Sequence, residues 1–217
     1  MKDNNARRKR GFNFIAPFYD FLASFFFVGK LFKAQTYFIP QLKKARRALV
    51  LGGGTGKILT TLLKNNTAEE YHYIDIAEAM VERAQKRTRT FAHTHCIRFT
   101  CAALENAPLE KYDLIVTPFI LDCFDDVSLE KILPRLSTAL SKNGEWLFVD
   151  FNIPTGKRRV LAHAIVKFLY FCFNLLCALD VKKLPLFEKL FAQVGFQRIH
   201  EKYFLYKLVA ARVYHKT

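Results

Sequence analysis

The stretch ALVLGGGTGKILTTLL, residues 48–63, decides how this chain is interpreted. Four apolar residues run directly into four glycines within five positions, and a helix-like pattern follows. Glycine loses more backbone entropy on folding than any other residue, so such a cluster indicates a sharp turn whose backbone another group must approach closely. The stretch therefore predicts a strand, a glycine loop and a helix in succession.

Strand-like and helix-like segments alternate after this loop. The expected elements are strands at 47–52, 71–76, 97–101, 112–117 and 145–151, with helices at 56–65, 78–89 and 128–141. Such alternation predicts parallel strands with helices on both faces of the sheet. A helix at 185–194 precedes two strand-like runs, 196–204 and 206–215, whose short connection requires antiparallel pairing. The expected fold is α/β: a doubly wound, Rossmann-like, mostly parallel seven-stranded sheet with an antiparallel C-terminal hairpin strand.

Two segments stand outside this alternation. Residues 1–11 are charged and expected to be loose, whereas residues 12–39 are rich in phenylalanine, which favours one or two short buried helices. We therefore expect a basic tail with aromatic lid helices at 1–40 and a main domain at 41–217. Residues 156–183 are interpreted as an apolar helical insertion in that domain.

Composition restricts the partners and the compartment. The chain has 217 residues, with 34 Lys and Arg against 19 Asp and Glu, and its net charge of +15 favours nucleic acid, a phospholipid surface or an acidic substrate. Its five cysteines form no CxxC pair and no zinc spacing, which indicates reduced thiols. No secretion signal is recognised. The expected location is cytoplasmic, with peripheral contact at the inner membrane face left open.

The glycine loop is a candidate ligand site. Gly52, Gly54 and Gly56 follow G-x-G-x-G, and Lys57 breaks the dinucleotide fingerprint. The shorter spacing keeps the loop flat, so that a ligand without phosphates can lie across it. Asp75 ends the next strand, 23 positions after Gly52, where a carboxylate can accept hydrogen bonds from both hydroxyls of a ribose. The alternatives are a simple tight turn at the loop and a helix N-cap at Asp75.

Several segments resemble class I S-adenosylmethionine-dependent methyltransferases. They are, in order, LVLGGGTGKIL, YIDIAEAMVERAQKR, YDLIVTPFILDCF, GEWLFVDF and FEKLFAQVGF. The similarity is closest to the ubiquinone and menaquinone C-methyltransferases, in which a segment like FNFIAPFYDFL, residues 12–22, precedes the core. It extends over about residues 12–217 and is strongest at 47–89. The resemblance implies S-adenosylmethionine as the cofactor, and no metal.

The resemblance also implies roles for individual residues. The methionine part and the ribose would be held by Gly52, Gly53, Gly54, Thr55 and Gly56, with Asp75 on the ribose hydroxyls. The other implied contacts are Ile76 and Met80 near the adenine, Ala103 and Leu104 at its edge, Thr117 and Pro118 below the sulfonium, and Tyr19 on a lid.

Two positions depart from the family pattern. Val50 and Ala103 stand where the family usually carries acidic residues. The loss of both acids leaves a degenerate, non-catalytic cofactor fold as an alternative to an enzyme.

No residue is an obligatory general base. Methyl transfer depends mainly on positioning the nucleophile, and a base is needed only when the acceptor must lose a proton. Asp122 is a candidate near the carboxyl edge of the sheet, although a capping or solvated aspartate beside Asp125 and Asp126 is more common. His93 and His95 have a spacing that can bind metal, but without a third ligand we expect a surface pair.

Residues 160–179, VLAHAIVKFLYFCFNLLCAL, bear on the acceptor. Seventeen of these 20 residues are apolar, a length that can span a bilayer. On a helix, the polar residues His163, Lys167, Tyr170 and Asn174 lie within about 60° of one another. This stripe favours a helix that covers the active site with the stripe toward the pocket. Its apolar faces would meet the N-terminal helices, a second copy of the chain or a lipid surface. An ordinary buried helix is the alternative.

The expected function is methylation of a small lipophilic or aromatic acceptor. An RNA-directed methyltransferase is the main rival, because a charge of +15 favours phosphate contacts. Against it, the basic residues are spread over many segments and no RNA-binding module is recognised. Nucleic acid is therefore the less favoured partner, and a homodimer stays open.

Overall fold

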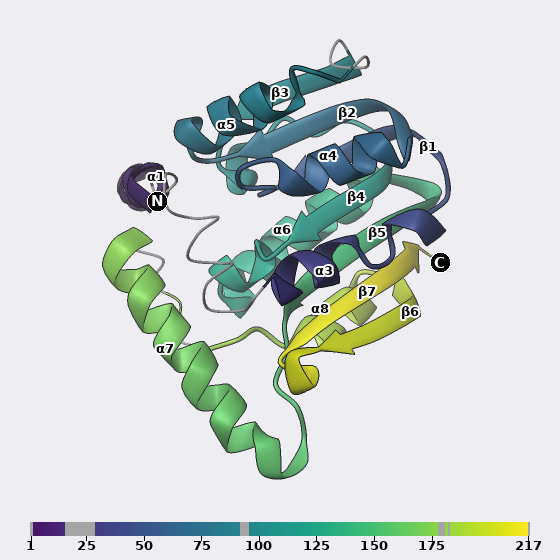
Figure 1. Cartoon of the computed structure of the whole chain (residues 1–217). Helices are drawn as coiled ribbons and strands as arrows, with labels where there is room; N and C mark the ends of the chain where they lie inside the picture. Colours follow the sequence, from purple (N-terminus) through teal and green to yellow (C-terminus); the bar gives the residue numbers. More distant parts are fainter. Residues whose placement is uncertain (1, 16–28, 92–95, 178–180, 182, 217) are drawn as a thin grey trace.

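A seven-stranded sheet forms the centre of the molecule (Figure 1). The computed structural model describes residues 2–15, 29–91, 96–177, 181 and 183–216, so Tyr19, His93 and His95 lie outside the described residues. The strands are β1 (Ala45–Leu51), β2 (Ala68–Asp75), β3 (Ile97–Cys101), β4 (Tyr112–Pro118), β5 (Leu140–Phe151), β6 (Phe196–Phe204) and β7 (Val209–Lys216). Their order in the sheet is β3-β2-β1-β4-β5-β7-β6.

The pairing directions confirm the predicted fold class. Strands β3, β2, β1, β4 and β5 pair in parallel with their neighbours. Strand β7 runs antiparallel to both β5 and β6, as the short connection between the last two strands predicts.

Helices cover both faces of this sheet. They are α1 (Lys2–Ile15), α3 (Lys30–Thr36), α4 (Lys57–Lys64), α5 (Glu78–Thr88), α6 (Asp126–Ala139), α7 (Arg159–Cys177) and α8 (Phe187–Gln193). Side chains alternate between the faces along each strand, so β1 places Ala48 and Val50 in the core under α3, α4 and α5. It places Leu49 and Leu51 in the second core, under α6 and α8.

The N-terminal segment differs from the sequence-based expectation. Residues 1–11 were expected to be loose, but from Lys2 onward they belong to helix α1, which packs against α5 and α7. The reason is that α1 finds specific partners: Lys9 pairs with Glu78, and Phe12 packs against the small core around Ala77. A charged sequence does not reveal such partners.

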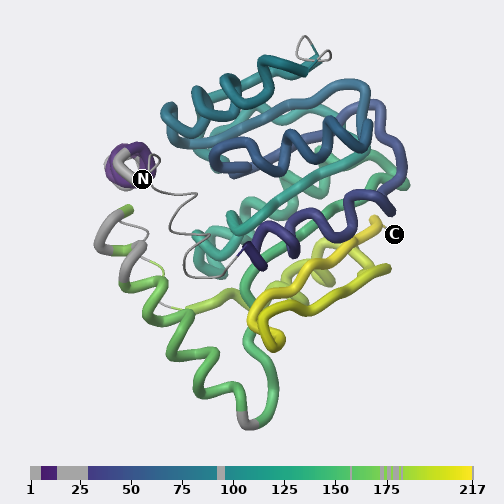
Figure 2. Tube along the Cα trace, in the orientation of Figure 1, coloured from purple at the N-terminus to yellow at the C-terminus, as the bar shows by residue number. Residues whose placement is uncertain are grey.

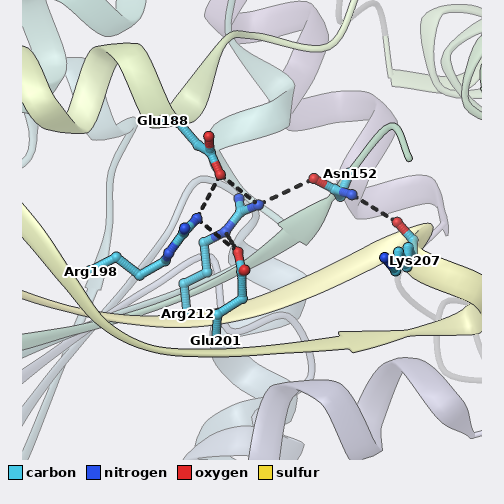
Figure 3. A network of polar contacts seen from close by, with 6 residues as sticks. All are labelled: Asn152, Glu188, Arg198, Glu201, Lys207 and Arg212. Carbon is cyan, nitrogen blue, oxygen red and sulfur yellow. Dashed lines mark hydrogen bonds and ion pairs between the residues drawn. The ribbon is translucent and has the colours of Figure 1, made fainter. Parts of the chain in front are cut away.

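A charged network fixes the C-terminal hairpin to the rest of the sheet (Figure 3). At its centre Arg212, whose side chain is 3% exposed, donates to Glu201 Oε1 at 2.6 Å and to Asn152 Oδ1 at 3.2 Å. Arg198 bridges Glu201 and Glu188, the latter contributed by α8. The network connects β6, β7, α8 and the residue that follows β5. Removing one member would be costly, because it would leave a buried charge without its partner.

Candidate functional site

A cavity lies at the carboxyl edge of the sheet, where β1 is flanked by β2 on one side and β4 on the other. Open α/β sheets bind ligands at such a point, because the loops leaving the two central strands diverge there. The structure brings four predicted residues to the cavity wall, namely Gly52, Asp75, Ile76 and Leu104. The prediction that the glycine loop and the end of the next strand lie together is therefore confirmed.

Different structural constraints require glycine at different positions of the loop. Gly52, Gly54 and Gly56 have φ of +63°, +59° and +82°, in the left-handed region that other residues adopt only at a cost. A Cβ on Gly56 would lie 2.7 Å from Ala84 Cα, so this glycine lets α4 pack closely against α5. A Cβ on Gly53 would lie 2.5 Å from the ring of Tyr73. Gly52 lines the cavity itself, which makes it the glycine most directly tied to a ligand.

The carboxylate of Asp75 connects the loop to the following helix. Its Oδ2 accepts a hydrogen bond from Gly54 N at 3.3 Å, and its Oδ1 accepts one from Ala77 N at 3.0 Å. Burial raises the pKa of Asp75 to about 6, because an ionised carboxylate loses its hydration there. Ala77, and not Asp75, is the N-cap of α5, so Asp75 is not simply a helix cap.

The predicted adenine side is only partly assembled. Ile76 and Leu104 line the cavity, while Met80 is 2% exposed and packs beside Ala77. Ala103 is absent from the wall, and Glu105, two positions later, contributes to it. Glu105 belongs to the stretch FTCAALENAP, so an acidic residue near Ala103 was the available signal.

Val50, which stands where the family usually carries an acidic residue, belongs to the apolar core. Its side chain is fully buried and packs beneath the loop, 3.1 Å from where a Cβ on Gly53 would be. A carboxylate at this apolar position would lose its hydration at a high cost in free energy.

The predicted floor residues lie away from this cavity wall. Thr117 is fully buried, and its hydroxyl oxygen accepts a hydrogen bond from Trp146 Nε1 at 2.9 Å. Pro118 is buried at the end of β4 and is also absent from the wall. Ile120 and Phe124 line the cavity instead. Thr55 is buried beside the loop, and its carbonyl accepts a hydrogen bond from Arg87.

Helix α1 closes the cavity. Arg8 pairs with Glu105 at 3.0 Å and lies 4.7 Å above the ring of Phe124, while Phe12 forms another part of the wall. The space left is about 30 Å³, which is enough for about one water molecule. The predicted lid segment begins at Phe12, but no motif in the sequence singles out Arg8 as part of this site.

Asp122 is neither a cap nor a solvated group. It is 6% exposed, and its backbone N–H donates to Asp150 Oδ2 at 3.2 Å. Burial raises the pKa of Asp122 to about 6, and burial together with the charge of Asp122 raises the pKa of Asp150 well above its usual range. The helix cap is Asp125, whose Oδ1 accepts from Ser128 N at 2.8 Å.

The polar stripe of α7 does not face this cavity. Tyr170 is buried, and its hydroxyl donates to the carbonyl of Asp122 at 3.3 Å. Asn174 donates to the carbonyl of Val181, while His163 and Lys167 are exposed. The expectation that the whole stripe points into the pocket is therefore wrong, because the helix is turned so that the stripe lies at the border of its buried face.

Comparisons with known proteins agree with this geometry. Residues 49–146 match the family described as a methyltransferase domain. The malonyl-[acyl-carrier protein] O-methyltransferase of Halorhodospira halophila is 30% identical over 112 residues, covering 51% of this chain. The chain spans only 36% of that curated relative's length.

Solved structures share the fold over most of the chain. The mitomycin 7-O-methyltransferase MmcR has a TM-score of 0.67 at 15% identity, over 87% of this chain and 54% of its own. The N-methyltransferase NodS of Bradyrhizobium japonicum, solved with S-adenosyl-L-homocysteine, has a TM-score of 0.60 at 13% identity, over 86% of this chain and 83% of its own. Likeness at this level of identity reaches the fold and no further.

Proposed function

We propose that the chain is a class I S-adenosylmethionine-dependent methyltransferase that transfers a methyl group from this cofactor to a small acceptor. The match of residues 49–146 to a methyltransferase domain and the shared fold support this proposal. The observation that carries the proposal is the buried carboxylate of Asp75 beside the left-handed glycine loop. When bound, the cofactor supplies an electrophilic methyl group on a sulfonium.

The residues at the cavity fit an adenosyl group. The missing side chain of Gly52 leaves the loop backbone bare at the cavity, where a Cβ would lie 2.6 Å from Ile120. Asp75 supplies a desolvated acceptor for two hydroxyls, and Ile76 and Leu104 supply apolar surface for a flat ring. Gly54, whose N–H already points at Asp75, ties the loop to this carboxylate.

Admission of the cofactor requires α1 to move. A space of about 30 Å³ is far too small for a nucleoside, and Arg8 and Phe12 form part of its wall. Displacing α1 breaks the ion pair between Arg8 and Glu105 and exposes the side chains of these two residues to water. The closed state would therefore lower the rate of cofactor association while excluding water from the seat.

We infer a lipophilic or aromatic acceptor because apolar side chains, among them Phe12, Ile120 and Phe124, form much of the cavity wall. The names of the similar proteins give malonyl-[acyl-carrier protein], a small acyl group carried on a protein, and mitomycin, a small molecule, as their substrates. These names support a small methyl-accepting group but no single compound. A proton-losing acceptor would need a base, and we assign none.

One experiment distinguishes the proposed enzyme from its two alternatives, a non-catalytic cofactor-binding fold and an RNA-directed methyltransferase. We would titrate the protein with S-adenosyl-L-homocysteine in a calorimeter and then incubate it with methyl-labelled S-adenosylmethionine and a cellular extract of lipophilic compounds. Saturable binding and a labelled small molecule, identified by mass spectrometry, are expected. Binding without any labelled product would favour the degenerate fold, label in RNA would favour the RNA-directed enzyme, and absence of binding would refute the cofactor assignment.

A further inference from the structure

Helix α7 carries a second apolar face, opposite the one that packs on the molecule. Ala162, Val166 and Tyr170 are buried, whereas the large side chains of Val160, Leu161, Phe168 and Phe171 are 79%, 64%, 56% and 65% exposed. With 100° per residue, these four side chains fall within an arc of about 100°. They extend over roughly 16 Å of the helix, since each residue adds about 1.5 Å.

An exposed stripe of this kind needs an explanation. Isolated apolar side chains are ordinary on protein surfaces, but a contiguous patch containing two phenylalanines marks an interaction site. Figure 2 shows α7 at the margin of the molecule beside α1, with its outer side away from the strands. The stripe is thus accessible along its length.

The charge pattern around the stripe indicates what covers it. Residues 151–179 contain no aspartate or glutamate, whereas they contain Lys157, Arg158, Arg159 and Lys167. Arg159 and Lys167 are exposed, and Lys167 lies at the edge of the apolar arc. Arg158 stacks 4.9 Å over the ring of Tyr206, itself 76% exposed at the tip of the β6–β7 hairpin.

We propose that the outer face of α7 docks onto the surface of an anionic phospholipid membrane, with the helix lying in the plane of the interface. The four apolar side chains would enter the boundary between headgroups and acyl chains, while Arg159 and Lys167 contact anionic headgroups. Among the helices the structure describes, none combines the length and apolar character needed to cross a bilayer.

Other occupants fit the surface less well. RNA would use the arginines and lysines, but large aliphatic side chains such as Val160 and Leu161 gain little against a phosphate backbone. A second copy of the chain would place two strips of like charge opposite each other, which disfavours close association. An anionic membrane satisfies both the apolar arc and its basic border.

The binding surface is tested with vesicles and does not depend on the proposed methyl transfer. The protein is sedimented with vesicles of phosphatidylcholine alone and of phosphatidylcholine with phosphatidylglycerol, at low and high salt. We expect binding to the anionic vesicles only, weakened by salt. The double variant F168S/F171S should lower the vesicle affinity by at least about tenfold, because each buried phenylalanine contributes strongly to partitioning.

Matched variants separate the two contributions. Val127→Ser removes an exposed apolar side chain on α6 and should leave vesicle binding unchanged. Arg159→Gln with Lys167→Gln should weaken binding by more than about fivefold, whereas Lys131→Gln, on α6, should have little effect. Circular dichroism confirms that each variant is folded.

Three results would overturn the proposal. The first is no binding to anionic vesicles at low salt. The second is binding that responds to the charge variants but not to F168S/F171S, since that would be non-specific electrostatic attraction. The third is a dimer in light scattering that F168S/F171S converts to a monomer, which would assign the surface to a second copy. Calorimetry with S-adenosyl-L-homocysteine on the same samples reports separately on the proposed function.

Discussion

The two edges of the sheet carry two different cavities. At the carboxyl edge, the space between Gly52, Asp75 and α1 is about 30 Å³. At the opposite edge, a cavity of about 430 Å³ is lined by Arg47, His72 and Tyr112, among others. Size alone would favour the cavity at the amino ends of the strands, whereas the proposed cofactor site lies at their carboxyl ends.

The polar groups at the large cavity satisfy one another. His72 Nδ1 accepts from the Tyr112 hydroxyl at 2.7 Å and from Arg98 at 2.9 Å, and its Nε2 donates to Thr100 Oγ1 at 2.8 Å. Glu110 pairs with both Arg47 and Arg98. Burial, and then the charge of Arg98, lowers the pKa of His72 to about 4, so the ring is neutral at physiological pH.

The small cavity is built differently. Its loop adopts left-handed backbone conformations, and its carboxylate is buried among backbone N–H groups and apolar side chains. We infer from this difference that a glycine loop with a left-handed backbone and a desolvated carboxylate favour a binding site, whereas a wide cavity whose polar groups pair with one another favours a structural network. The following experiments test this contrast.

The largest effect is expected from Asp75→Ala. Loss of two charge-assisted hydrogen bonds, together worth about 3 kcal/mol or more, should weaken binding of S-adenosyl-L-homocysteine by at least about 100-fold. Calorimetry measures the affinity, and Asp75→Asn, which keeps one acceptor oxygen, should fall between. Unchanged affinity in Asp75→Ala would contradict the proposal that Asp75 binds the ribose hydroxyls.

His72→Leu should lower the stability of the fold without changing the affinity for S-adenosyl-L-homocysteine. Without the imidazole, Tyr112 and Thr100 lose a buried partner, which should lower the free energy of unfolding by about 2 kcal/mol. Urea denaturation measures this, with calorimetry expected to give an affinity within about twofold of wild type. A loss of cofactor affinity as large as that of Asp75→Ala would break the contrast between the edges.

The same histidine predicts an acid-sensitive stability. Because its folded pKa is depressed, its contribution is present above about pH 6.5 and is lost as the pH falls toward 4. His72→Leu should flatten this part of the pH profile.

Cofactor binding should depend on the ionisation of Asp75, at the carboxyl edge of the sheet. The folded pKa of Asp75 is raised, so its favourable contribution to stability is present below its unfolded value and is lost as the pH rises through about 6. Ribose hydroxyls donate to the ionised form, so affinity should rise with pH through about 6, by up to about tenfold per unit below that value. A flat profile in wild type, or a persistent slope in Asp75→Asn, would assign the effect to another group.

The smallest effect is expected from Arg8→Met. Methionine keeps an apolar stem against Phe124 but loses the largely buried ion pair with Glu105, which lowers the stability of the closed position of α1. Cofactor association, followed by stopped-flow fluorescence, should become a few-fold faster. The control is Lys9→Met. Lys9 lies on α1 with Arg8, and this variant removes its exposed pair with Glu78 of α5.

The sequence was sufficient for the fold class and for bringing four predicted residues to one cavity. Glycines and a strand-ending aspartate are local signals, so Gly52 and Asp75 were placed correctly beside each other. The alternation of strands and helices was enough to predict parallel pairing, but the order of the strands in the sheet was not predicted.

The rest depended on contacts between distant segments. Arg8 reaches Glu105 across 97 positions, and no local pattern reports such a pair. Thr117 lies outside the cavity wall, and its hydrogen bond with Trp146 on the neighbouring strand could not be identified from residue type. The turn of α7 about its axis, which leaves Lys167 in solvent, was likewise set by what the helix packs against.

The participation of α1 in the cavity wall has a practical consequence. Affinity tags fused ahead of Lys2 would continue directly into the helix that carries Arg8 and Phe12. Extra charge or bulk there would alter how firmly the helix seats, and with it any measured cofactor affinity. Recombinant protein for ligand studies is therefore better handled through its other terminus, beyond the hairpin.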